Sequence, residues 1–234
     1  MRLIKTLLIS AVLLMSATGM QAAGFNQNGN YLTVQLKQHQ NFGPSQIRLQ
    51  VVSDKIIRVQ ATAEQSFRNK QSLIIVPQNS KANYKVEEQG DNLIITTAAM
   101  RAVMNEATGQ ITFYDLKDNV LLNEVAQGGK TFKPFTVPDR EMGVDIAKVP
   151  EAQKHGWSWR ALFNSPDNEA FYGLGQHQSE ELNMKGKNED LFQYNTKVSV
   201  PFVISNKNYG ILWDSYSYCR WGNPEDYLQL NRAF

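Results

Sequence analysis

The segment "QIRLQVVSDKIIRVQA" spans residues 46–61 and decides the fold class. Apolar and polar residues alternate on both sides of Ser53-Asp54, which is typical of two strands joined by a tight turn. Successive side chains of a strand point to opposite faces, so each half of this segment buries one face only. The segment therefore predicts an antiparallel hairpin over 46–52 and 55–61 that packs on a core by one side.

The same pattern extends through the first half of the chain. Polar clusters such as Gln89-Gly90-Asp91 separate short apolar stretches at a spacing typical of a sandwich or barrel. We find no apolar stripe of an amphipathic helix of three turns or more, so a parallel α/β sheet is excluded. We expect an all-β, antiparallel β-sandwich with further strands at 31–37, 72–77, 83–88, 92–97, 101–105, 110–115 and 119–124.

Residues 126–156 interrupt this pattern and hold three of the eight prolines. We expect a long connection here, with one short strand at 131–137. Trp157 and Trp159 then share one face of a strand, and Pro201 is expected at a strand edge or bulge because it has no N–H to donate. Asn206-Lys207-Asn208 is a hairpin signal. The strands predicted in this part lie at 157–163, 169–175, 198–206 and 209–218.

The first 23 residues have the layout of a secretory signal peptide. Arg2 and Lys5 precede an apolar run at 7–15, and small residues follow up to Ala22-Ala23. The run is too short to span a bilayer comfortably. We therefore expect a signal peptide over 1–23 and a sandwich domain over 24–234.

Removing the signal peptide changes the charge balance. The chain has 24 Lys and Arg against 22 Asp and Glu, so loss of Arg2 and Lys5 leaves a formally neutral protein. A neutral chain gives no reason to expect nucleic acid or an anionic membrane as partner. Cys219 is the only cysteine, so no disulfide forms within the chain and the signal segment offers no cysteine for a lipid anchor. We expect a periplasmic or secreted protein without a membrane span after cleavage.

The stretch "FYGLGQHQSEELNMKGKNEDLFQYNT" at 171–196 contains Gly173 and Gly175 but neither the third glycine nor the helix of a dinucleotide site. The glycines instead predict tight backbone geometry at a strand end. His39, His155 and His177 have no metal-ligand spacing, and no metal is expected. The neighbouring carboxylates of the last third are interpreted as solvated loop charges, since adjacent residues rarely face each other across a bond as glycoside hydrolysis requires. They are Glu180-Glu181, Glu189-Asp190 and Glu225-Asp226.

Aromatic residues crowd the last 80 residues, and amide side chains accompany them in 176–195. Sugars pack their CH faces on rings and need amide and carboxylate partners for their hydroxyls. Phe171, Phe202 and Trp213 fit a sandwich core. Phe192 and Tyr194 fit it less well, because they sit beside polar loop residues.

The run "FYGLGQHQSEELNMKGKNEDLFQYNTKVSVPFVISNKNYGILWDSYS" at 171–217 resembles the N-terminal domain of glycoside hydrolase family 31, most of all that of bacterial α-xylosidases. "VVSDKIIRVQA" at 51–61 and "NEATGQITFYDLKDNVLLNE" at 105–124 also resemble it, and the resemblance covers about 27–234. It implies a galactose-mutarotase-like β-sandwich, incomplete at its C-terminal end, in a retaining α-glycosidase that acts on xyloglucan-type oligosaccharides.

In that family the two catalytic aspartates lie in a (β/α)₈ barrel that follows the sandwich, and some members carry a PA14-type insert near the equivalent of Phe234. The resemblance therefore implies no catalytic residue and no cofactor in this chain, and we expect the chain alone to be inactive. It also implies that the loop 176–196 reaches over the barrel mouth. The candidate substrate-binding residues are Gln176, Gln178, Lys185, Phe192 and Asn195.

Three other functions stay open on the residues alone. The chain could be a free-standing carbohydrate-binding β-sandwich without hydrolase activity. It could be a mutarotase that uses His177 with Glu180 or Glu181 as acid and base. It could also be a packing platform for a barrel, with no ligand of its own.

Overall fold

The computed structural model describes residues 24–37, 41–68, 71–76, 82–136, 145–178 and 181–222. The expected signal peptide therefore lies outside the described residues. Every strand pair in the described part is antiparallel, and its helical segments are two short ones, η1 (Ile146–Lys148) and α1 (Glu151–Lys154). The predicted all-β antiparallel architecture is confirmed.

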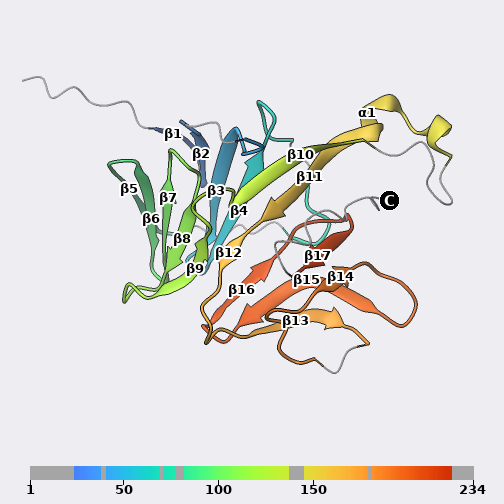
Figure 1. The fold of residues 1–234 in the computed structure, drawn as a ribbon. Coiled ribbons are helices and arrows are strands. Elements are labelled where there is room, and N and C mark those ends of the chain that lie inside the picture. The colour runs from blue at the N-terminus through green and yellow to red at the C-terminus, as the bar shows by residue number, and fades with distance from the viewer. Residues whose placement is uncertain are drawn as a thin grey trace, which may run out of the picture.

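Two sheets form the first sandwich (Figure 1). One is a four-stranded meander of β1 (Phe25–Asn28), β2 (Tyr31–Gln35), β3 (Gln46–Ser53) and β4 (Ile56–Thr62). The other has the order β12-β9-β8-β7-β6-β5. Its strands are β5 (Tyr84–Gln89), β6 (Asn92–Thr97), β7 (Arg101–Asn105), β8 (Ile111–Tyr114), β9 (Val120–Glu124) and β12 (Phe163–Asn164).

The inward residues of these two sheets form one core. In β3, Ile47, Leu49 and Val51 are fully buried while the residues between them are not, as the alternation in 46–61 predicts. The predicted hairpin forms, but its turn lies at Asp54 and Lys55, one residue later than predicted, because β3 continues to Ser53 with a bulge between Val51 and Ser53. Burial of these apolar side chains is the main stabilisation of the sandwich. The buried members of the core are Leu32, Val34, Leu36, Ile47, Leu49, Val51, Leu93, Ile95, Ala102, Met104 and Ile111.

Two strands leave this sandwich as a long ribbon, β10 (Lys130–Thr136) and β11 (His155–Ala161). Trp157 lies opposite Pro134, and Trp159 lies opposite Phe132. Both tryptophans are 41% exposed, so the prediction that they share one face is confirmed.

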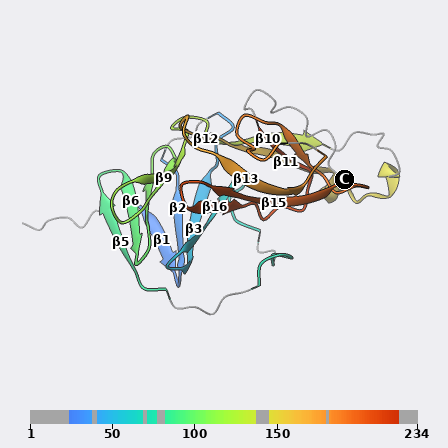
Figure 2. The same cartoon turned by 90° about the horizontal axis from the view of Figure 1, so that it is seen from below.

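A second, smaller unit follows the ribbon and lies below it in Figure 1. Its three-stranded sheet has β15 (Val198–Ser205) between β13 (Phe171–Gln176) and β16 (Tyr209–Leu212), and β14 (Glu189–Leu191) pairs with β17 (Cys219–Trp221). Figure 2 shows this sheet from below. The core of this unit joins the inward side of the sheet to the β14–β17 pair. Its buried residues are Phe171, Leu174, Met184, Leu191 and Val203. The partly buried residues packed against them are Tyr209, Ile211, Trp213, Cys219 and Trp221.

Three predictions about strands and core are wrong. The strand expected at 209–218 ends at Leu212, and no strand forms over 213–218. No strand forms in the described part of 72–77, where Leu73 is 81% exposed and Val76 is 74% exposed. Residue 77 itself lies outside the described residues. Phe202 is not a core residue, because it is 37% exposed on the outward face of β15, whereas Phe171 and Trp213 do pack in the core.

Candidate functional site

The loop between β13 and β15 follows a stretch of β13 with unusual backbone geometry. Gly173 and Gly175 have φ of 131° and 100°, and Leu174 between them has φ of 66°. A Cβ on Gly173 would lie 2.6 Å from Phe202 O, and one on Gly175 would lie 2.0 Å from Val198 O, so only glycine fits at either place. The predicted tight geometry is confirmed, but the glycines lie inside β13, which continues to Gln176.

Pro201 lies in a bulge of β15, opposite this stretch of β13. The pairing of β13 with β15 passes from Gly173–Val203 to Gly175–Ser199, so residues 200–202 face a single residue, Leu174. Proline is tolerated where a strand ladder is interrupted. The expectation of a bulge at Pro201 is therefore confirmed.

A buried group of polar side chains holds the loop to the sheet. Glu189 Oε1 lies 2.6 Å from His177 Nδ1 and 2.6 Å from Lys197 Nζ, and the three side chains are 15%, 5% and 8% exposed. His177 Nε2 also lies 2.7 Å from Leu174 O. The approach of His177 Nδ1 to Glu189 is a close polar contact without the direction of a hydrogen bond. Glu189 is thus not the solvated loop charge that we expected.

The tip of the loop is a turn from Tyr194 to Lys197. Lys197 N donates to Tyr194 O over 3.2 Å, and the two residues form a β-bridge. The side chain of Gln193 fixes the same turn, because its Nε2 donates to Lys197 O over 2.6 Å and its Oε1 accepts from Ser199 N over 3.0 Å. Thr196 has φ of 69°, which is unusual for a β-branched residue. Backbone conformations of this kind concentrate at functional sites.

Exposed rings stand beside this turn. Phe192 stacks on Tyr194 with ring centroids 6.0 Å apart and an interplanar angle of 30°, and its ring centroid lies 6.4 Å from that of Tyr218. Phe192 is 40% exposed and Tyr194 is 54% exposed. Lys197 Nζ lies 5.7 Å from the centre of the Tyr194 ring on the same turn. We call Phe192, Tyr194, Asn195 and Tyr218 the aromatic tip.

The structure separates the candidate residues into two places. Gln176 pairs with Val198, immediately after the turn that carries Asn195, so Gln176 lies at the tip end of the sheet. Gln178 follows closely, and both glutamines are exposed. Lys185 lies near the other end of β13, where the preceding Met184 N donates to Phe171 O and Lys185 Nζ contacts Pro166 O. The six residues of β13 separate these ends by roughly 15 Å.

The sequence analysis names His177 and Glu189 but does not group them with each other or with Lys197. The bulge and the β14–β17 pair bring these three residues together in the fold. Of the carboxylates weighed as partners of His177, Glu181 pairs with Lys187 at 2.6 Å instead. Glu180 lies outside the described residues. The polar neighbours of Tyr194 in the sequence indicate that its ring does not lie in a core, and its exposure confirms this.

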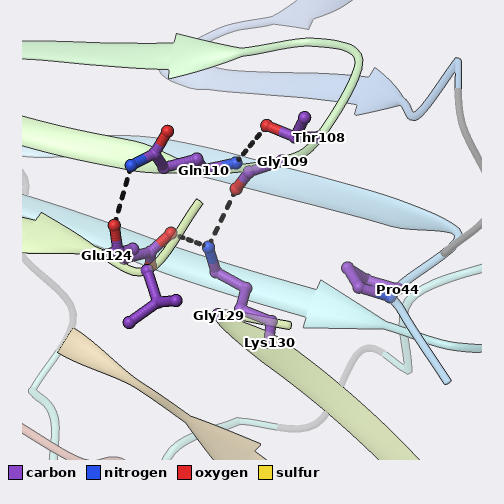
Figure 3. A pocket seen from close by; sticks show the side chains of 8 residues that line it. Pro44, Thr108, Gly109, Gln110, Glu124, Gly129 and Lys130 are labelled. Atoms are coloured by element: carbon purple, nitrogen blue, oxygen red, sulfur yellow. Dashed lines mark hydrogen bonds and ion pairs between the residues drawn. The ribbon is translucent and has the colours of Figure 1, made fainter. Parts of the chain in front are cut away.

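A second polar cluster lies in a recess beside β9 and β10 (Figure 3). Lys130 Nζ contacts Glu124 Oε2 and lies 3.0 Å from Gly109 O, while Ile111 N donates to Glu124 Oε2 over 2.8 Å. Burial raises the pKa of Glu124 and lowers the pKa of Lys130, because loss of water penalises both charges. The recess holds a free volume of about 10 Å³, less than a sugar ring needs. The buried contact between Lys130 and Glu124 therefore links β10 to β9.

The described ranges contain neither a metal-binding cluster nor a membrane-spanning helix. No group of three or more His, Cys, Asp or Glu side chains there is arranged to hold a metal ion. No helix there is long and apolar enough to cross a membrane.

Comparison with known proteins gives a family match over most of the chain. Residues 46–221 match the family model described as the glycosyl hydrolase 31 N-terminal galactose mutarotase-like domain. The galactose-mutarotase-like β-sandwich inferred from the resemblance is thereby confirmed.

Individual relatives agree with this match. The chain is 26% identical over 178 residues to an uncharacterised family 31 glucosidase of Pseudescherichia vulneris, covering 72% of this chain and 32% of that protein. It is 25% identical to an α-xylosidase of Saccharolobus solfataricus, covering 75% of this chain and 23% of that one. The crystal structure of the family 31 α-xylosidase of Xanthomonas citri superposes with a TM-score of 0.72 at 36% identity, over 85% of this chain and 20% of that chain. The chain thus spans a third or less of the length of these relatives.

Proposed function

The chain belongs to the glycosyl hydrolase 31 family as its N-terminal galactose mutarotase-like domain, and from that premise we propose that its aromatic tip lines the entrance of a sugar-binding active site. The observation that carries the proposal is the exposed pair of rings on a tightly fixed loop. Phe192 and Tyr194 are half-exposed, yet buried charges hold the loop beneath them. A rigid, exposed ring is suited to stack on the apolar face of a sugar.

The proposed substrate is a xylose-bearing oligosaccharide of the xyloglucan type. The α-xylosidases among the relatives support this choice. Rings at the tip would take the CH face of a xylosyl unit, while the exposed amides of Asn195, Gln176 and Gln178 would exchange hydrogen bonds with its hydroxyls. We assign the catalytic carboxylates to a barrel domain beyond this chain. The role of the chain is therefore to shape subsites and to exclude water from them.

We also propose that the protein is exported. The layout of residues 1–23 supports a periplasmic or secreted location, where xyloglucan fragments are met. Amino-terminal sequencing of the protein recovered from the periplasm or the culture medium tests this. A mature chain that starts at Ala23 or Gly24 is expected, and an uncleaved Met1 would contradict it.

The test of the loop uses a chimera in which residues 24–234 replace the matching fifth of the Xanthomonas citri α-xylosidase. Phe192→Ala, Tyr194→Ala and Asn195→Ala should each lower kcat/KM on xylosylated oligosaccharides about tenfold, because each removes a contact with the bound sugar. Lys185→Ala is the comparison within the loop, since Lys185 lies at the far end of β13. Unchanged kcat/KM for all tip variants, with Gln176→Ala and Gln178→Ala included, would sink the proposal.

A second candidate function rests on the ribbon. Trp157 and Trp159 are exposed side by side on β11, outside both cores. A free-standing carbohydrate-binding sandwich would use such a pair as a stacking surface. Calorimetric titration of the isolated chain with xyloglucan oligosaccharides should then give binding that Trp157→Ala abolishes. If the titration gives only the heat of dilution, the isolated chain does not bind these oligosaccharides. That result would favour the active-site function over the carbohydrate-binding one.

A further inference from the structure

The sheet of β13, β15 and β16 has a second apolar side that neither core uses. Side chains on one side of the sheet, such as Val203 and Ile211, are packed in the second core. The residues between them point outward and are large, apolar and exposed. We call them the outer face: Tyr172, Val198, Val200, Phe202, Ile204 and Leu212, which are 39%, 49%, 40%, 37%, 49% and 45% exposed.

The outer face is continuous across the three strands. Tyr172 lies opposite Ile204, and Phe202 lies opposite Leu212. Gly210 leaves room for the Phe202 ring, whose Cε2 and Cζ lie 3.0 Å from where a Cβ would be. Together the six side chains expose several hundred Å² of mainly apolar surface, which is as much as the largest patch of an ordinary soluble monomer.

No charged residue interrupts this face. The remaining outward positions of the three strands are occupied by Gln176 and Gly210. A strand that faces water on one side normally alternates apolar with polar residues, as β3 does with Arg48 and Gln50. On β15 the outward side is entirely apolar, whereas the inward side carries Ser199 and Ser205. An outward side of this kind is the pattern of a strand that another surface covers on that side. The face is thus suited to an apolar protein surface rather than to a charged ligand.

We propose that the outer face is the surface on which the catalytic remainder of a family 31 enzyme packs, an inference that rests on the proposed function. The relatives supply the occupant, since this chain matches only 20% of the Xanthomonas citri enzyme and 23% of the Saccharolobus solfataricus one. The face also continues into the candidate site. Val198 begins β15 directly after Lys197, and Gln176 pairs with it at the tip end. A domain that packs on the outer face therefore contacts the aromatic tip at the edge of the interface.

Thiol labelling tests this burial directly. Val200→Cys is made in the isolated chain and in the chimera with the Xanthomonas citri enzyme, and the rate of maleimide labelling is measured in both. Leu116→Cys is the matched control, because Leu116 is 57% exposed in the turn between β8 and β9, away from the outer face. Cys219 stays in every protein, and the chain without a new cysteine gives its background rate. The cysteine at 200 should react about tenfold or more slowly in the chimera, while the one at 116 reacts equally in both.

Two labelling results would overturn the inference that a catalytic domain covers the outer face. Equal labelling at 200 in the two proteins, in a chimera that hydrolyses an α-xyloside, overturns the inference. Slowing at 200 that already appears in the isolated chain as its concentration rises assigns the face to a second copy of the chain and also overturns it. Where the chimera is inactive, the cysteine is placed at the matching position of the Xanthomonas citri enzyme itself. Its rate of maleimide labelling is then compared with that of Val200→Cys in the isolated chain. The proposed function fails separately, through unchanged kcat/KM of the tip variants.

Discussion

At the scale of single residues, Thr196 stores strain at the tip of the loop. Its φ of 69° brings the side chain of an L-residue against the following carbonyl, at a cost of about 1–2 kcal/mol. The β-branched side chain makes that conformation rarer still. The turn forms nevertheless, because Gln193 and the Lys197–Glu189 pair hold it on both sides.

Thr196→Gly should therefore stabilise the protein. Glycine removes the strain but loses more backbone entropy on folding, by about 0.5–1 kcal/mol, so we expect a net gain of about 0.5–1 kcal/mol and a rise in Tm of about 1–4 °C. Thermal unfolding followed by circular dichroism measures it. Asn208→Gly is the control, since Asn208 has φ of 65° and asparagine tolerates this region well. A fall in Tm for Thr196→Gly would mean that the threonine side chain contributes more than its strain costs.

Tyr209 is a second residue with a measurable signature. Its hydroxyl donates to Glu169 Oε1 over 2.6 Å, beside Ser205, which donates to the same atom over 2.6 Å. Burial and the Glu169 carboxylate raise the pKa of Tyr209 above its ordinary value of 10.0. The folded protein thus keeps this proton at pH values where the unfolded chain loses it. The resulting stabilisation is complete below pH 10 and is lost as the pH rises further.

Tyr209→Phe should lower the free energy of unfolding by about 1–2 kcal/mol at pH 8, because Glu169 loses a donor. The difference from wild type should shrink as the pH rises from 10 to 11, which urea unfolding at each pH measures. Ser165→Ala removes another donor to Glu169, 2.9 Å away, without a titrating group, so its difference from wild type should stay constant. Parallel stability curves for wild type and Tyr209→Phe would contradict the assignment.

At the scale of elements, the sequence predicts those strands whose pattern and turns agree. Residues 92–97 and 101–105 are strands within their predicted bounds, because alternation fixes the buried face and short polar turns fix the register. The run at 72–77 fails because it finds no partner strand; Ser72 instead binds Asp214. Alternation predicts Phe202 in the core because its side of β15 is the more apolar one. That prediction is wrong because this side faces outward, while the inward side carries Ser199 and Ser205.

The candidate site was predictable as a segment but not as a geometry. Composition located the loop between β13 and β15, and the poor fit of Phe192 and Tyr194 to a core anticipated their exposure. Lys185 was grouped with the tip by sequence proximity, although the chain turns back and leaves it at the far end of β13. Strands of three residues such as β14 and β17 have too few positions to show a period, so their pairing was missed.

The anchor of this loop can be tested through Glu189. Glu189→Gln keeps the shape of the side chain but leaves Lys197 buried without a counter-charge. Removing one partner of a buried charge group costs about 3–5 kcal/mol, and partial exposure of Glu189 places the expected loss near the lower end. We expect a Tm lower by about 6–12 °C and faster amide exchange at the tip. Glu181→Gln breaks an exposed pair with Lys187 and should change Tm by no more than about 3 °C.

At the scale of the whole molecule, the two cores are joined by a polar cluster around Asp214. Arg58 of β4 lies 2.6 Å from Asp214 Oδ2, although 156 positions separate the two residues. Ser72 and Tyr216 each donate to Asp214 Oδ1 over 2.8 Å. The cluster thus ties the first sandwich to the end of β16, and it also holds the exposed segment around Leu73 through the Tyr216 hydroxyl.

Asp214→Asn should weaken this link while leaving each core intact. Arg58 loses its charged partner, at a cost of about 1.5–3 kcal/mol for hydrogen bonds to charged groups. Since the cores are packed separately, we expect the unfolding of the variant to broaden or divide into two calorimetric transitions, one for each core. The second unit should melt first, because its sheet has three strands and its outer face is open in the isolated chain.

Asp118→Asn provides the control for this prediction. It removes a similar ion pair, Arg101–Asp118 at 2.7 Å, but Asp118 is 72% exposed and the pair lies within the first sandwich. An exposed pair of this kind contributes about 0–1 kcal/mol, so the thermogram should keep its shape. If Asp214→Asn also leaves a single transition at the Tm of wild type, the two units are coupled by the ribbon and the backbone rather than by this cluster. Domain packing on the outer face would then have to stabilise the second unit without help from Arg58.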